Sequence, residues 1–85
     1  SVQAQSRATE RLDLHGLSVD EAVRRLEKAI DEALLSSLSR LEVIHGKGTG
    51  KIRHAVHHYV KGLSAVLRYE EDIANTGVTW IYFKE

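Results

Sequence analysis

The sequence contains no cysteine and no methionine, and no long stretch of it is apolar throughout. The lack of cysteine excludes disulfides and thiolate metal sites and fits a reducing compartment, so we expect a cytoplasmic protein. No segment approaches the roughly 18–20 apolar residues that a membrane-spanning helix needs, and no signal peptide is recognisable, so we expect no membrane partner. Because the chain begins at Ser1 and has no methionine, we predict that it is a piece of a longer protein.

The 85 residues also carry no net charge, but their charges are unevenly distributed. Residues 40–69 contain six lysines and arginines against one acid, a net charge of +5, and they hold four of the five histidines. The flanking stretches, residues 1–39 and 70–85, carry −2 and −3. This concentration of positive charge indicates a polyanion partner, although a solvated helix face would explain it equally well.

Hydrophobic periodicity predicts one α/β domain over residues 12–85, preceded by a polar linker at residues 1–11. Alternating leucines indicate a first strand that ends at Gly16. Ser18 and Glu21 form a capping box at the start of a helix. The elements predicted after that strand are a helix over 19–34, a strand over 41–45, a helix over 52–63, and strands over 65–70 and 78–83.

The order β-α-β-α-β-β predicts a two-layer sandwich. Right-handed crossovers place both helices on one face of a four-stranded mixed sheet. Leu12 and Leu14 would then face the helices, while Asp13 and His15 would face the open side. The aromatic residues of the last strand, Trp80 among them, either lie on that open side, where they would stack on bases, or belong to the core.

The segment HGKGTGK, residues 45–51, places three alternating glycines and two lysines before the second predicted helix. Glycine lets the backbone adopt left-handed angles and approach an anion, and a helix N-terminus offers unpaired N–H groups. A flexible turn is the alternative, but the two lysines favour a phosphate site. The predicted phosphate-binding residues are Gly16 of the earlier His-Gly pair, Gly46, Lys47, Gly48, Thr49 and Gly50 of this loop, and Lys51 and Arg53, which are added from their charge.

This loop does not match the common nucleotide-binding motifs. Gly46 and Gly50 are separated by three residues, whereas a P-loop has four between its first glycine and its Gly-Lys pair. Ile52 also stands where a P-loop needs serine or threonine for magnesium. The spacing differs from the dinucleotide motif G-x-G-x-x-G as well, so we do not expect a free ATP or NAD site.

Acid–base residues stand at the ends of the first two predicted strands. Asp13 and His15 project to the same side of one strand, and His45 ends the next. Taken alone, a D-x-H pair is more often structural than catalytic. If the two strands are neighbours, however, a carboxylate, two imidazoles and a phosphate site converge, which suits phosphodiester cleavage. One carboxylate is too few for a two-metal centre, so a single Mg²⁺ or Mn²⁺, or no metal, is expected.

His54 and His58 are four residues apart, a spacing that can bind zinc on a helix. The sequence offers no third ligand beside them, and we predict no metal-ligating residues in this chain. With Arg53, His57 and Lys61 they are better explained as a partly basic helix face that follows a nucleic-acid backbone.

Two motifs, LDLHG (residues 12–16) and HGKGTG (residues 45–50), resemble those of the Smr (small MutS-related) domain, and the resemblance extends from Leu12 to Phe83. It implies a fold similar to the C-terminal domain of bacterial translation initiation factor three. It also implies nucleic-acid binding and, in many members, endonuclease or nicking activity on DNA or RNA. The residues that the motifs mark are Asp13, His15, Gly16, His45, Gly46, Lys47, Gly48 and Gly50.

Such domains often form the C-terminus of a bacterial MutS paralogue, so the resemblance implies a larger MutS-like protein with branched or nicked DNA, or ribosomal RNA, as partner. Two functions follow. The first is a nicking endonuclease in which Asp13, His15 and His45 are catalytic. The alternative is a non-catalytic module that targets a larger MutS-like ATPase to DNA or ribosomal RNA. A protein-interaction domain is a third hypothesis, and the site loop would then bind an anion only incidentally.

Overall fold

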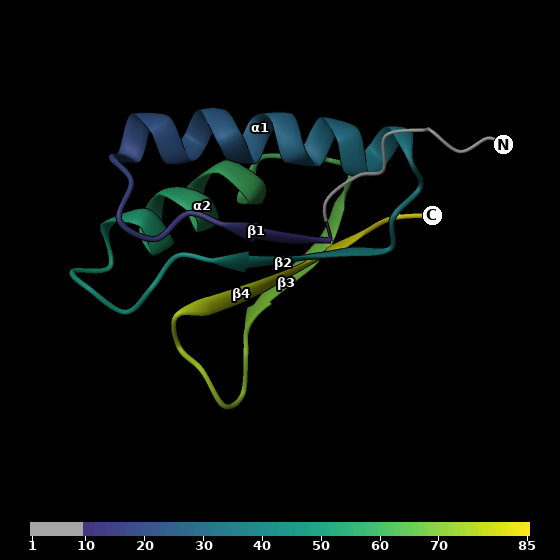
Figure 1. The fold of residues 1–85 in the computed structure, drawn as a ribbon. Coiled ribbons are helices and arrows are strands. Elements are labelled where there is room, and N and C mark those ends of the chain that lie inside the picture. The colour runs from purple at the N-terminus through teal and green to yellow at the C-terminus, as the bar shows by residue number, and fades with distance from the viewer. Residues whose placement is uncertain (1–9) are drawn as a thin grey trace, which may run out of the picture.

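The computed structural model describes residues 10–85 (Figure 1). Most of the predicted linker, residues 1–9, lies outside the described residues, while Arg11 already belongs to the first strand. Six elements follow in the predicted order: β1 (Arg11–Asp13), α1 (Val19–Leu35), β2 (Arg40–Ile44), α2 (Lys51–Lys61), β3 (Val66–Glu71) and β4 (Val78–Phe83).

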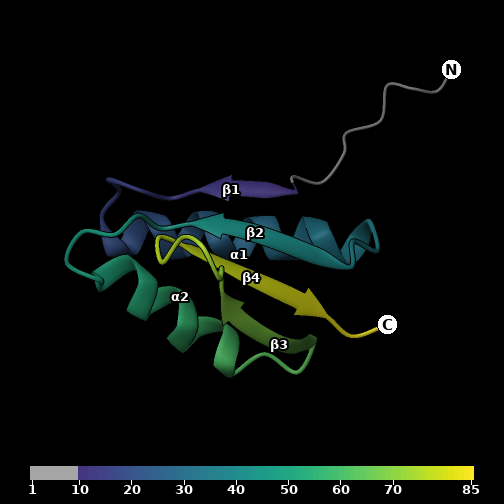
Figure 2. The same cartoon turned by 90° about the horizontal axis from the view of Figure 1, so that it is seen from below.

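The four strands form one mixed sheet in the order β1-β2-β4-β3 (Figure 2). β1 and β2 are parallel neighbours, and β4 pairs antiparallel with both β2 and β3. The last strand of the chain therefore occupies an inner position of the sheet. Because β1 and β2 run in the same direction, the loops that leave them emerge at the same edge, which decides where the candidate site lies.

Both helices cover the same face of the sheet, as Figure 1 shows, and the predicted two-layer sandwich is confirmed. The core lies between the layers because alternate strand residues meet the apolar stripe of each helix. Its largest fully buried apolar side chains are Leu14, Leu26, Ile30, Leu41, Val43, Val56, Val60 and Ile81. Within residues 10–85, neither helix is long and apolar enough to cross a lipid bilayer.

The open face of the sheet carries the two aromatic side chains whose position the alternation left undecided. Trp80 and Tyr82 are half-buried there, in the register opposite to Ile81. The Arg40 guanidinium lies 4.6 Å from the centroid of the Trp80 ring, and that of Arg68 lies 4.1 Å from Tyr82. Each ring is thus already covered by a cation, so a base could stack on it only after the arginine moves.

Candidate functional site

Two loops meet at the edge of the sheet where β1 and β2 end. We call residues 14–18 the first loop and residues 45–50 the glycine loop. The Leu14 amide donates to the Ile44 carbonyl at 2.7 Å, which continues the parallel ladder past β1. A Cβ built on Gly46 would lie 3.3 Å from the Cβ of His15, so the backbones are in close contact. The predicted proximity of the two strand ends is therefore observed.

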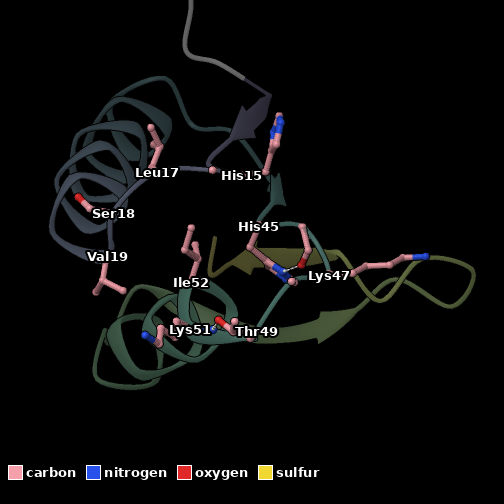
Figure 3. A pocket seen from close by; sticks show the side chains of 13 residues that line it. His15, Leu17, Ser18, Val19, His45, Lys47, Thr49, Lys51 and Ile52 are labelled. Carbon is pink, nitrogen blue, oxygen red and sulfur yellow. Dashed lines mark hydrogen bonds between the residues drawn. The ribbon is translucent and has the colours of Figure 1, made fainter.

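A solvent-open cavity of about 540 Å³ separates the N-termini of the two helices (Figure 3). Its lining comes from residues 15–19 and 45–52, so it lies between the first loop and the glycine loop. A hollow of this volume has room for a phosphate with its attached sugar. Most of the predicted phosphate-binding residues line it.

Asp13 and His15 form an exposed acid–base pair beside this cavity. One carboxylate oxygen of Asp13, Oδ1, lies 2.6 Å from His15 Nδ1 and also accepts from the His15 amide at 3.1 Å. The side-chain hydrogen bond from His15, with the backbone one, holds the pKa of Asp13 below its ordinary value of 3.8. The carboxylate is therefore ionised at neutral pH and orients the ring, which leaves the largely exposed His15 side chain with its Nε2 available to a substrate or to water.

The ring of His15 does not point into the cavity. In Figure 3 it extends away from His45 and Ile52, toward the side where Asp13 lies. The His45 ring, in contrast, points inward over β4. The fold thus brings the two loops together but not the two imidazoles, so a phosphate within reach of His15 must lie at the rim of the cavity.

His45 is buried, with only 5% of its surface exposed. Its Nδ1 lies 3.0 Å from the carbonyl oxygen of Gly46, and its Nε2 lies 2.8 Å from Thr79 Oγ1. Both ring nitrogens are therefore used in hydrogen bonds inside the protein. The catalytic role predicted for His45 stays a prediction, and its surroundings favour a structural one.

The glycine loop leaves several backbone amides without an acceptor. His45 and Gly46 both donate their amides to the carbonyl of Gly77, at 2.9 and 3.0 Å. Among residues 10–85, no acceptor is present for the amides of residues 47–50. Gly50 is the N-cap of α2 at φ +85° and makes no capping bond. An uncapped helix N-terminus with free N–H groups is suited to an anion.

Glycine is required at two positions of this loop. Gly46 and Gly50 adopt positive φ angles of 78° and 85°, which favour glycine, whereas Gly48 does not have a positive φ. Gly16 in the first loop also has a φ of 78° and turns the chain from β1 toward α1. Lys47 and Lys51 are exposed and add positive charge to this part of the surface, although in Figure 3 the Lys47 side chain extends away from His45 and Ile52.

Arg53 is engaged elsewhere. Its guanidinium Nη1 donates to Glu71 Oε2 on β3 at 2.7 Å. It borders a second, smaller hollow of about 290 Å³ on the other side of the glycine loop, which Thr76 also lines. Of the predicted phosphate-binding residues it is therefore the one that the fold places apart from the first loop.

One residue of this region, Thr79, was missed by the sequence reasoning, and His57, which was expected on the basic outer face of the second helix, turns toward the core instead. Thr79 of β4 is fully buried and contacts His45, and its hydroxyl also lies 2.9 Å from Nε2 of His57 on α2. The available signal was a polar residue in the core-facing register of β4, where Ile81 and Phe83 are both buried. A buried polar side chain needs partners, and here both partners are histidines.

Comparison with known proteins places these features in a family. The family model described as "Smr domain" matches residues 12–84, which is most of the chain. The chain is 43% identical over 76 residues to endonuclease MutS2 of Geobacillus thermodenitrificans and 53% identical over 51 residues to that of Pelotomaculum thermopropionicum. These matches cover 86% and 60% of this chain but only 10% and 6% of the relatives.

Two solved structures have the same fold. The Smr domain of Thermus thermophilus MutS2 superposes with a TM-score of 0.86 at 31% identity, and the match covers 91% of this chain and all of that one. YdaL, a stand-alone small MutS-related protein from Escherichia coli, gives a TM-score of 0.84 at 21% identity, covering 96% of this chain and 70% of that one. The chain belongs to the Smr domain family.

Proposed function

We propose that this domain binds nucleic acid through a backbone phosphate at the glycine loop and hydrolyses a phosphodiester bond of that strand, so that it acts as a nicking endonuclease. The observation that carries the proposal is the contact between two complementary loops. One presents free amides and lysines, and the other presents an ionised carboxylate with an accessible imidazole. DNA, branched or nicked, is the first substrate to test, and ribosomal RNA is the second.

Binding follows from the N-terminus of α2. Its uncapped amides and those of the glycine loop offer several hydrogen-bond donors to one phosphate, and the helix dipole adds partial positive charge. Lys47 and Lys51 provide full charges nearby. None of these groups distinguishes one base from another, so binding is expected to depend on salt and on the shape of the substrate rather than on sequence.

Cleavage follows from the Asp13–His15 pair. His15 Nε2 takes a proton from a water molecule as its oxygen attacks phosphorus, and Asp13 stabilises the resulting imidazolium. The P–O bond to the leaving sugar oxygen then breaks, and that oxygen takes a proton from the imidazolium or from solvent. The lysines and free amides stabilise the charge that accumulates on the phosphoryl oxygens.

The carboxylates at the site limit what metal it could hold. Within residues 10–85 no group of three or more His, Asp or Glu residues is placed to bind a metal ion. Asp13 alone fits a Mg²⁺ or Mn²⁺ shared with the substrate phosphate, since such ions often have one or two protein carboxylates. That ion would neutralise phosphate charge.

A non-catalytic binding module is the second candidate, and the direction of the His15 ring favours it. The ring points away from the cavity, so phosphate binding at the glycine loop does not require it. The relatives named endonuclease MutS2 are about ten times longer than the matched region. The domain would then direct such a larger MutS-like protein to DNA or ribosomal RNA.

Nicking of supercoiled plasmid separates these two functions. Asp13→Asn should lower the nicking rate at least about 100-fold, a typical loss for a group engaged in acid–base catalysis, while binding is kept. Asp31→Asn, which removes an exposed carboxylate on α1, is the matched control. Parallel reactions with Mg²⁺, Mn²⁺ and chelator test the metal. Full nicking by the Asp13 variant would remove that residue from the chemistry, and wild-type binding without nicking would favour the second function.

A further inference from the structure

Three polar side chains meet beneath the glycine loop, and each comes from a different element. His45 follows β2, Thr79 lies on β4 and His57 lies on α2. Thr79 is fully buried and His45 nearly so. The Thr79 hydroxyl is 2.8 Å from His45 Nε2 and 2.9 Å from His57 Nε2. The two rings are 6.2 Å apart and nearly perpendicular, so the hydroxyl connects them without ring stacking.

Only one arrangement of protons satisfies these contacts with neutral rings. The Gly46 carbonyl can only accept, so His45 Nδ1 carries the proton that it donates there. Nε2 of a neutral His45 is then an acceptor, and the single hydroxyl proton of Thr79 is donated to it. The Thr79 oxygen must in turn accept from His57, whose proton therefore lies on Nε2. Burial is the largest cause that lowers the pKa of His57, and it favours the neutral ring that this arrangement requires.

A chain of hydrogen bonds, which we call the relay, runs from His57 through Thr79 and His45 to the Gly46 carbonyl. This contact holds that carbonyl against the imidazole. Since the peptide is planar and trans, the amide of Lys47 points to the opposite side, away from the ring. Lys47 begins the run of amides for which the described residues provide no acceptor. The relay therefore fixes the direction of the first donor that a bound phosphate would meet.

We propose that His57 and Thr79 are positioning residues that orient the glycine loop through His45. The functional part of this inference rests on the proposed phosphate binding. The relay itself is a statement about protons and can be tested without any ligand.

Long-range ¹H–¹⁵N NMR spectra of the histidine rings test the proton assignment directly. We expect His45 to carry its proton on Nδ1 and His57 to carry its proton on Nε2 at neutral pH. Thr79→Val, which keeps the shape of the side chain and removes the hydroxyl, leaves His45 Nε2 without its donor and His57 Nε2 without its acceptor, so it should shift the ¹⁵N signals of both rings and change the amide shifts of residues 46–50. The opposite tautomers in the wild type, or unchanged amide shifts in the variant, would overturn the relay.

Binding of a duplex DNA oligonucleotide tests the consequence. Thr79→Val should weaken binding about tenfold, the effect of one misdirected hydrogen bond, whereas Thr79→Ser retains the hydroxyl and should stay within about twofold of wild type. His57→Gln keeps a donor nitrogen and should bind better than His57→Leu. All affinities are measured at a temperature well below the Tm of each variant, so that differences in folding stability do not alter the measured binding.

The possible failures are distinguishable. If Thr79→Val binds as wild type although the loop amides have shifted, the positioning role is wrong and the proposed function stands. If wild type itself does not bind nucleic acid while the tautomers are as expected, the proposed function fails and the relay remains a structural device of the loop.

Discussion

The two strand–loop–helix units of this domain lead into their helices in opposite ways. At the start of α1, the Ser18 hydroxyl accepts from the Glu21 amide, and the first turn contains Asp20 and Glu21. At the start of α2, Gly50 offers no side chain, and its first turn contains no acid. Lys51 stands there instead. The first helix thus has a side-chain cap at its N-terminus, whereas in the second the N-cap residue provides none and only Thr49 Oγ1 offers the Lys51 amide a long contact of 3.4 Å.

This difference shows how one fold supplies both stability and a site. Free amides at a helix N-terminus must be satisfied by a side chain, by water or by a ligand. α1 uses its own cap and acids, which favour the helix dipole, and its 17 residues form the longer helix. α2 keeps the same partial charge available to an external anion. We infer that the first helix N-terminus contributes mainly to folding and the second mainly to binding.

Removing the cations from the uncapped helix should have the largest effect. We expect the double variant Lys47→Ala/Lys51→Ala to bind DNA on the order of 50-fold more weakly at low salt, because two phosphate contacts are lost. Its plot of log K against log[salt] should be shallower by about two. Fluorescence titrations over a salt series give both values. Lys28→Ala/Lys84→Ala removes the same charge from exposed positions outside the proposed binding surface and should change the affinity little.

Giving α2 an anion of its own should have an intermediate effect. Gly50→Asp adds a carboxylate where the ligand phosphate is expected, so binding should weaken about tenfold. The neutral variant Gly50→Asn is the control, because asparagine and aspartate both tolerate positive φ better than other residues. A Cβ at this position meets only Arg53 Nη2, at an ordinary 3.7 Å. Equal binding by the two variants would show that charge at this helix N-terminus is unimportant.

Removing the cap of α1 should alter stability but not binding. Ser18→Ala is expected to lower the free energy of unfolding by about 1 kcal/mol, because the Glu21 amide loses its acceptor, while Ser18→Gly should cost only a few tenths. Urea denaturation measures both. DNA affinity should stay within about twofold of wild type, and a clear loss of affinity would contradict the division between the two helix N-termini.

The smallest expected effect concerns pH. Burial lowers the pKa of His57 below its ordinary value of 6.5. Between the two pKa values the unfolded chain binds a proton that the folded chain does not, so the folded state loses stability as the pH falls below about 6.5. His57→Gln should reduce this loss. Urea denaturation at pH 7.5 and 5.5 compares the two proteins, and an identical pH dependence would mean that His57 does not contribute.

Local sequence pattern was sufficient for the fold. Period-two leucines located β1, and the Ser18–Glu21 capping box placed the start of α1 correctly. The first strand ends at Asp13, earlier than alternation indicated, although the Leu14 amide still donates to the Ile44 carbonyl, and the next amide, that of His15, bonds to the Asp13 carboxylate. The sequence reasoning left open whether the first two strands are neighbours. The parallel pairing of β1 with β2 meets that condition and brings Asp13 and His15 beside the glycine loop.

The direction of side chains could not be predicted in the same way. His45 turns inward because Thr79, 34 residues away, offers it a buried hydroxyl. Arg53 turns toward β3 because Glu71 lies there, 18 residues further along the chain. The pattern around each residue holds no information about such distant partners. The one indication in the sequence was a polar residue, Thr79, in the core-facing register of β4. Its partners can be identified only when the order of the strands in the sheet is known.

The inner position of β4 has a consequence for synthesis. This strand leaves the ribosome after the other five elements of the domain, yet it pairs with both β2 and β3 and supplies Thr79, while the turn before it supplies the Gly77 carbonyl that holds the glycine loop. A nascent chain that stops before residue 78 has every lysine and histidine of the site but lacks the strand that shapes it. Binding competence should therefore arise in one late step, when the final strand inserts.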